Sequence, residues 1–287
     1  NLSLQIMFLW WTAELVMLPQ IKSIQGTYKM FRSKAFDSEG NFDRHGFESL
    51  GESRATLCEM AVNVPLFLSA CLLLWIIRCL DEFRAIWRRK HALDNLPPLP
   101  DGLAPSHMVH EIDFRMGDYI DEERNLIVCL DTCTRILLEV FVFVPRFIVA
   151  GCLLFIGTSF LFASASCTEL ILNSLAMAFV FDIDLLLFHV FMPLRFRKIL
   201  EKTVLKCPHD DKRSHKSGEQ IYEHHIKRGY RQSIFFFILS LAFLLMWLKF
   251  QPILPGFEWD IRPHCVAYLP TFSKLPCAPW NGNCLAN

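Results

Sequence analysis

Residues 147–165 read FIVAGCLLFIGTSFLFASA and contain no charged side chain. A helix of this length is long enough to cross the hydrocarbon core of a bilayer, which is about 30 Å thick. The whole chain has 287 residues, of which 53% are hydrophobic and only 20% are charged. Because the apolar residues come in unbroken runs rather than at the spacing of a soluble core, the sequence predicts a multi-pass membrane protein.

Three other runs have the same character. The four predicted spans are residues 60–80, 136–165, 168–194 and 233–250. The expected fold class is therefore all-α, a polytopic transmembrane bundle of about four spans. Residues 1–59 are expected to hold a peripheral N-terminal helix and an outer-side segment, because Gln5 and Glu14 interrupt the apolar run Leu2–Leu18. Whether this run also crosses the bilayer is left open.

The basic residues assign the two sides of the membrane. They are concentrated in residues 81–135, a Pro-containing linker followed by an amphipathic helix from about Asp118, and in the basic loop 195–232. Both segments are predicted to be cytoplasmic, and the two spans between them are consistent with that placement. Residues 251–287 then form a Cys- and Pro-rich outer tail. Basic and acidic residues number 29 each, so the net charge gives no reason to expect a nucleic-acid partner.

The outer tail contains three of the eleven cysteines, Cys265, Cys277 and Cys284. Cysteines in an outer tail rich in Pro and Trp favour a disulfide in an oxidising compartment, with Cys58 or Cys167 as a possible partner. A tail with free thiols is the alternative. An integral protein of the secretory pathway or the plasma membrane is favoured over an organellar one.

Polar residues inside the predicted spans are the main functional candidates, because ionisable groups at membrane depth usually face a protein interior or a water-filled cavity. They are Glu139, Arg146, Glu169, Asn173, Asp182, Asp184 and His189. One hypothesis is a cation or proton path lined by the carboxylates, with Arg146 as a counter-charge. The other, which is favoured, is a set of structural ion pairs and hydrogen bonds between spans.

Motifs for metal ions or cofactors are weak. Asp37, Glu39, Asn41 and Glu48 occupy ligand positions of a calcium loop, but Phe42 replaces the glycine that such a loop needs, so a solvated acidic turn is favoured. The Cys and His residues of the basic loop match no zinc spacing, and its expected partner is anionic lipid headgroups. The sequence holds no nucleotide-binding glycine motif and no G-x-S-x-G, so neither a cofactor nor an enzymatic activity is expected.

The segment 135–197 contains the stretches VFVPR, LFIGTSFL and ELILNSLAMAFVFDID. In these stretches the chain resembles a group of multi-pass membrane proteins of dinoflagellate algae. The resemblance implies a multi-pass fold and no particular activity. The positions that match the shared pattern are Pro145, Arg146, Glu169, Asn173 and Asp184, whereas Leu186 stands where an acidic residue often occurs.

Two functional hypotheses follow. The first is an ion-channel or transporter-like subunit whose third span lines a polar path; with only four spans it would require a homo-oligomer or a larger membrane complex. The second is a non-catalytic membrane anchor or scaffold subunit. Replacing a span-3 carboxylate by its amide should distinguish them, because only a conducting path loses flux.

Overall fold

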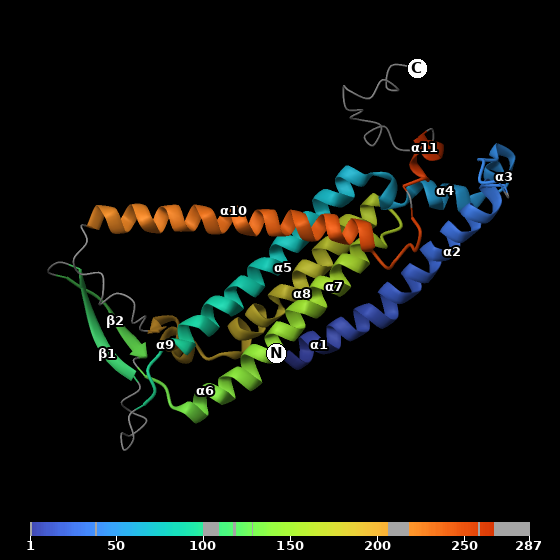
Figure 1. Cartoon of the computed structure of the whole chain (residues 1–287). Coiled ribbons are helices and arrows are strands. Elements are labelled where there is room, and N and C mark those ends of the chain that lie inside the picture. The colour runs from blue at the N-terminus through green and yellow to red at the C-terminus, as the bar shows by residue number, and fades with distance from the viewer. Residues whose placement is uncertain are drawn as a thin grey trace. The chain divides into compact units, whose positions relative to one another are not determined.

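A computed structural model describes residues 2–37, 39–99, 109–116, 119–127, 129–205, 218–257 and 259–266. Figure 1 shows that the described chain is dominated by long helices. In chain order the elements are α1 (Leu2–Trp11), the π-helical η1 (Thr12–Met17), α2 (Leu18–Ala35), α3 (Arg44–Glu48), α4 (Glu52–Glu59), the 3-10 turn η2 (Ala61–Asn63), α5 (Pro65–Asp94), β1 (Val109–Met116), β2 (Tyr119–Ile127), α6 (Thr132–Leu138), the π-helical η4 (Glu139–Phe143), α7 (Val144–Phe162), α8 (Cys167–Phe191), α9 (Leu194–Lys202), β3 (Thr203–Leu205), α10 (Gly218–Phe250) and α11 (Arg262–Cys265). The predicted all-α class is confirmed, apart from one small sheet.

Three helical stretches are long and apolar enough to cross a membrane: Ser3–Ala35, Thr132–Phe162 and Tyr230–Phe250. The last two match the second and fourth predicted spans. The first differs from the expected peripheral helix, because α1, η1 and α2 follow one another without a break through Pro19. Pro19 is the second residue of α2 and directly follows the π-helical η1. Inside a continuous helix a proline removes one backbone hydrogen bond, so the regular α-helical pattern is interrupted at this point.

The long helices expose large apolar side chains. On α7 and α8, Phe147, Phe155, Leu172 and Phe179 are all more than half exposed, as is Phe235 on α10. Exposing rows of such residues to water would be unfavourable, whereas contact with lipid chains is favourable. Together with the three stretches that can span a bilayer, they identify the chain as an integral membrane protein.

The helix of the first predicted span begins later and runs further than expected. Pro65 opens α5, which continues without interruption to Asp94, 30 residues in all. Just before it, the buried Asn63 side chain donates hydrogen bonds to the carbonyls of Leu57 and Cys58, closing the turn that separates α4 from α5. The Arg- and Lys-rich stretch from Arg78 onward therefore lies on the same helix as the apolar run.

The prediction of a helix from about Asp118 is wrong over residues 119–127. Tyr119–Ile127 is a strand, β2, that pairs antiparallel with β1 and parallel with β3. The sequence shows why a hairpin competes here: two residues, Gly117 and Asp118, separate the paired strands, and a Gly-x pair is a common hairpin connection. The predicted helix resumes only at Thr132, where the Asp131 carboxylate caps α6 by accepting from the Cys133 N–H at 3.2 Å.

The chain forms two compact units. Unit 1 comprises Asn1–Ile6, Arg78–Leu153 and Phe181–Leu239, and unit 2 comprises Met7–Ile77, Leu154–Val180 and Ser240–Asn287. In unit 1, Leu93, Leu96 and Leu130 form a buried cluster where α5 ends and the chain approaches α6. The Arg135 guanidinium donates to the Leu96 carbonyl at 2.6 Å and fixes this connection.

Unit 2 has an aromatic centre outside the long apolar runs. Phe31, at the centre, is fully buried; around it lie Phe36, Phe42, Phe47 and His264, with ring centroids 5.5 to 6.4 Å apart in the contacts made by Phe31. His264 stacks on Phe42 with the centroids 3.6 Å apart. We call these five residues the cap cluster. They join α2 and α3 to the segment that follows α10.

Candidate functional site

Helix α5 carries the charges that pair with three of the candidates identified in the sequence. Arg78 lies 3.3 Å from the Asp182 carboxylate of α8. Glu82 accepts from Arg146 of α7 through both the Nε and an Nη of the guanidinium, each at 2.9 Å. Lys90 pairs with Glu139 of η4. All of these residues belong to unit 1, and we call the three pairs the α5 ion pairs.

The alternating charges of α5 explain which elements lie beside it. Arg78 and Glu82 are four residues apart and share one face of the helix, whereas Lys90 projects roughly 120° away from Arg78. One helix therefore meets α8, α7 and η4, in each case with a charge opposite in sign to that of its partner. Arg84 lies between these pairs and donates to the Gln232 amide at 3.3 Å, with its guanidinium 4.9 Å from the Phe236 ring centroid.

The Glu82–Arg146 pair borders a small cavity of about 20 Å³, which is enough for a single water molecule. Gln5 from α1 also lines it and is 8% exposed. The glutamine that interrupts the N-terminal apolar run is thus buried beside the two charges. Glu82 is the more enclosed partner, with 18% of its side chain exposed against 34% for Arg146.

A larger cavity of about 170 Å³ lies beside the Lys90–Glu139 pair. Phe83, Trp87, Phe143 and Phe147 give it largely aromatic walls, with Lys90 and Glu139 as polar members. Its apolar lining and its place between α5 and the η4–α7 stretch suit an apolar occupant rather than a hydrated ion.

The polar residues near the start of α8 form hydrogen bonds that cap the N-terminus of this helix. Glu169 accepts from the Ala165 N–H at 3.0 Å and from the Gln20 amide at 3.1 Å, while the Ser166 hydroxyl accepts from the Glu169 N–H. This is a capping-box arrangement, which satisfies N–H groups at a helix start. Asn173, one turn later, donates to the Ser164 hydroxyl at 3.0 Å. All of these residues lie in unit 2.

The candidate residues of the third span lie in different units. Glu169 and Asn173 lie in unit 2, whereas Asp182 and His189 lie in unit 1, where His189 is 3.1 Å from an Arg197 nitrogen of α9. The side chain of Asp184 lies outside the described part of the structure. The counter-charge next to Arg146 is Glu82, a residue that the sequence had placed in a cytoplasmic loop.

The weak calcium motif is engaged in other contacts. The Asp37 carboxylate accepts from the N–H groups of Glu39 and Asn41 at 2.9 and 2.8 Å, and these bonds hold the pKa of Asp37 below its ordinary value, the one from Asn41 most strongly. Glu48 pairs with Arg44 at 3.1 Å. Within the described ranges, no group of three or more His, Cys, Asp or Glu residues is placed to hold a metal ion.

The predicted disulfide of the outer tail is present between Cys58 and Cys265. It links α4 to α11, and Cys58 is one of the two partners that the sequence suggested. The other, Cys167, has a free thiol. Cys277 and Cys284 lie outside the described residues, so their pairing stays a prediction.

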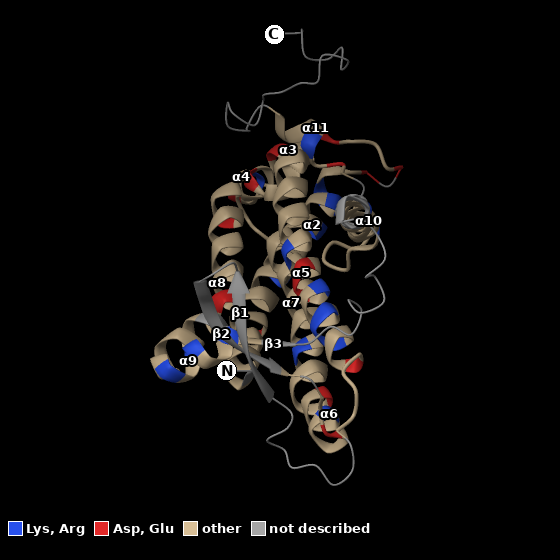
Figure 2. Cartoon of the chain, turned by 90° about the vertical axis from the view of Figure 1, so that its left-hand side faces the viewer, with Lys and Arg blue, Asp and Glu red and all other residues tan. Residues whose placement is uncertain are grey.

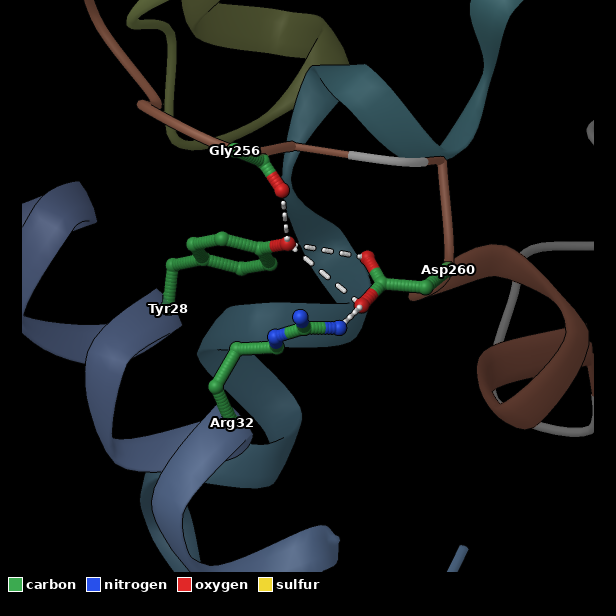
Figure 3. A network of polar contacts seen from close by, with 4 residues as sticks. All are labelled: Tyr28, Arg32, Gly256 and Asp260. Carbon is green, nitrogen blue, oxygen red and sulfur yellow. Dashed lines mark hydrogen bonds and ion pairs between the residues drawn. The ribbon is translucent and has the colours of Figure 1, made fainter. Parts of the chain in front are cut away.

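A polar network holds the segment after α10 on α2. The Tyr28 hydroxyl donates to the Asp260 carboxylate at 3.1 Å and reaches the Gly256 carbonyl at 3.4 Å, while Arg32 lies 3.0 Å from Asp260 (Figure 3). Asp260 is well enclosed, with 15% of its side chain exposed. Gln25 adds a hydrogen bond of 2.7 Å to the Ile253 carbonyl.

Sequence reasoning identified Asp182, Arg146 and Glu139 but missed their partners. The signal for those partners was the recurrence of Arg78, Glu82 and Lys90 at intervals of four and eight residues, which one continuous helix turns toward several neighbours. The Tyr28–Asp260 network had no local signal, because 232 positions separate the two residues.

The functional assignment must come from this geometry. No protein-family model, no curated protein and no solved structure matches the chain.

Proposed function

We propose that the chain is a non-catalytic anchor or scaffold subunit of a membrane, in which the α5 ion pairs hold helices together and do not conduct ions. The observation that carries the proposal is the engagement of Asp182, Arg146 and Glu139, each by an opposite charge of α5. A residue that passes ions along a path has to release one partner and accept the next. A charge in a fixed pair instead favours one arrangement of helices.

Two further features support this role. The capping contacts of Glu169 use a third candidate carboxylate for local structure. The cavity at the Glu82–Arg146 pair has a volume of only about 20 Å³. The exposed apolar faces of α8 and α10 provide surface for lipid and for neighbouring subunits, so we place the protein in a homo-oligomer or a larger membrane complex.

The Cys58–Cys265 disulfide supports a secretory-pathway or plasma membrane, because such bonds persist in oxidising compartments. The cap cluster and α11 would then face the lumen or the exterior. The basic end of α5, with Arg88, Arg89 and Lys90, would face the cytoplasm.

The test compares ion flux and thermal stability for three forms of the full chain reconstituted in liposomes. The forms are the wild type, Asp182→Asn, and the swapped pair Arg78→Asp with Asp182→Arg. We expect no proton or monovalent-cation flux above that of empty liposomes for any form. Asp182→Asn should unfold at a lower temperature, and the swapped pair should regain most of the loss because the attraction is restored with the charges exchanged.

A conducting path gives a different pattern. Wild-type flux above the empty-liposome level, abolished by Asp182→Asn and not restored by the swapped pair, would overturn the scaffold proposal in favour of a channel or transporter. Asp81→Asn, a carboxylate change at an exposed position of α5, is the matched control: it should alter neither flux nor stability.

A further inference from the structure

Helix α9 has a strongly two-sided sequence, LRFRKILEK, over Leu194–Lys202. At about 100° per residue, Phe196, Ile199 and Leu200 fall on one face of the helix. Arg195, Lys198 and Lys202 project from the opposite face. The helix contains four basic residues and one acidic residue, Glu201.

The apolar face is exposed. Phe196 is 61% exposed, Ile199 51% and Leu200 52%. In a water-soluble protein such a stripe is normally packed against a core, since removing apolar side chains from water is favourable. An exposed stripe of this kind therefore calls for an apolar environment outside the protein.

The position of α9 in the chain specifies that environment. Helix α8 ends at Phe191, whose side chain is 76% exposed, and Pro193 follows with an extended backbone that turns the chain into α9. The contact between His189 and Arg197 holds the two helices at this turn. The helix thus begins directly at the end of a long helix with large exposed apolar side chains.

We propose that α9 lies in the plane of the membrane interface and binds anionic lipid. Phe196, Ile199 and Leu200 enter the boundary between acyl chains and headgroups, and Arg195, Lys198 and Lys202 contact lipid phosphates and carboxylates. A polar face rich in Lys and Arg opposite a face with Phe and Leu is the usual composition of interfacial helices. Figure 2 shows the Lys and Arg residues of α9 in blue.

Charge favours lipid over a protein partner. Each Lys or Arg near an anionic leaflet is attracted to its negative surface potential. This attraction adds to the favourable free energy of moving the apolar face from water into lipid. Both faces of α9 would therefore contribute to binding at a bilayer surface. The proposal requires only that the chain resides in a membrane and is independent of the scaffold role.

The test places the photoreactive residue p-benzoylphenylalanine in the full chain, at one position at a time. The positions are Phe196 on the apolar face of α9, Arg44 of α3, which is 86% exposed and lies outside the apolar helical stretches, as the control without lipid contact, and Phe235 of α10, which is 61% exposed, as positive control for lipid contact. Each form is reconstituted in nanodiscs of phosphatidylcholine with or without phosphatidylserine, illuminated, and analysed by intact mass.

In nanodiscs that contain phosphatidylserine, we expect phospholipid adducts at position 196 with a yield comparable to position 235 and at least five-fold above position 44. Omitting phosphatidylserine should lower the yield at 196 several-fold, and Arg195→Glu with Lys198→Glu should lower it in the same way when phosphatidylserine is present. Equal yields at 196 and 44, no lipid adduct at 196 while 235 reacts, or cross-links from 196 to a second copy of the chain would each overturn the proposal.

Discussion

The hydrogen atom that serves as the side chain of Gly157 allows α7 to pack against the Trp75 ring of α5. A Cβ at this position would overlap the indole of Trp75, which is buried. Small residues at helix contacts are a general device for close approach in membranes. The requirement is local, because Gly151 on the same helix has no neighbouring atom within 4 Å of such a Cβ.

We therefore expect Gly157→Ala to lower the free energy of unfolding by about 1–3 kcal/mol, the usual cost of overpacking. Gly151→Ala should be neutral or slightly stabilising, since alanine favours a helix over glycine. Thermal unfolding of both variants in the same detergent measures the difference. Equal unfolding midpoints for the two variants would show that the Trp75 ring can move aside without a loss of stability.

His264 gives the cap cluster a dependence on pH. Burial lowers its pKa below the ordinary value of 6.5, and the Asp260 carboxylate opposes this only in part. The unfolded chain therefore takes up a proton at a higher pH than the folded chain does. Stability is full above about pH 6.5 and is lost as the pH falls from 6.5 through the lowered pKa.

The measurement is the unfolding midpoint at pH 8 and at pH 5 for the wild type and for His264→Phe, which keeps an aromatic ring on Phe42. We expect the wild type to lose more stability than the variant on acidification. An identical loss in both would assign the pH effect to other groups.

Residue-level prediction from the sequence succeeded for polar groups in apolar surroundings. Asp182, Arg146 and Glu139 stood out because a charge in an apolar run is rare and needs a partner. Gly157 and Tyr28 gave no such signal: glycine is unremarkable in a helix, and the significance of the tyrosine depends on Asp260, which is brought near only by folding.

At the scale of elements, α5 does most to organise unit 1, because its ion pairs connect it to α7, α8 and η4. Its Glu82 receives two guanidinium nitrogens of Arg146 and is largely enclosed. Removing one partner leaves the other charge uncompensated in a poorly solvated place. The cost is about 3–5 kcal/mol for a fully buried pair and smaller here, because a third of the Arg146 side chain is exposed.

We expect Glu82→Gln and Arg146→Gln each to destabilise the protein by about 2 kcal/mol, and the exchanged pair Glu82→Arg with Arg146→Glu to recover at least half of that. Arg44→Gln breaks the exposed Arg44–Glu48 pair and is the control, with an expected effect under about 0.5 kcal/mol. The double-mutant cycle is read from thermal unfolding in detergent. Additive losses in the exchanged pair would mean that the two charges do not interact.

The sequence predicted long helices well because apolar runs of this length have few alternatives. Residues 136–165 and 233–250 correspond to the stretches Thr132–Phe162 and Tyr230–Phe250. The ends of helices were harder to predict where a helix continues from an apolar into a charged sequence. This is the case in α5, whose basic end has the composition of a loop. The strand Tyr119–Ile127 was missed because its acidic start also suits the first turn of a helix.

On the scale of the whole molecule, the Cys58–Cys265 bond is the longest-range covalent link described, with the two cysteines 207 positions apart. A cross-link that closes so long a loop restricts the unfolded chain strongly, and native disulfides are typically worth about 2–5 kcal/mol. Cys58→Ser should therefore lower the unfolding midpoint in the absence of reductant. Cys152→Ser, at an exposed free thiol, should leave it unchanged.

The bond itself is checked by alkylation and intact mass. Without reductant, Cys58 and Cys265 should resist alkylation in the denatured wild type, and both should react after reduction. If Cys58 is alkylated without reduction, the pair is not formed in the mature protein, and the assignment to an oxidising compartment loses its basis.

The same bond changes what a protease can do to this protein. The segment 195–232, which includes most of α9, the first part of α10 and many Lys and Arg residues, lies between the two cysteines in the chain. A single cut there by a trypsin-like enzyme would leave two polypeptides that still migrate together until a reductant is added. Such a cut would thus neither shed a fragment nor show itself on a non-reducing gel, and a nicked form could persist in the membrane as one covalent molecule.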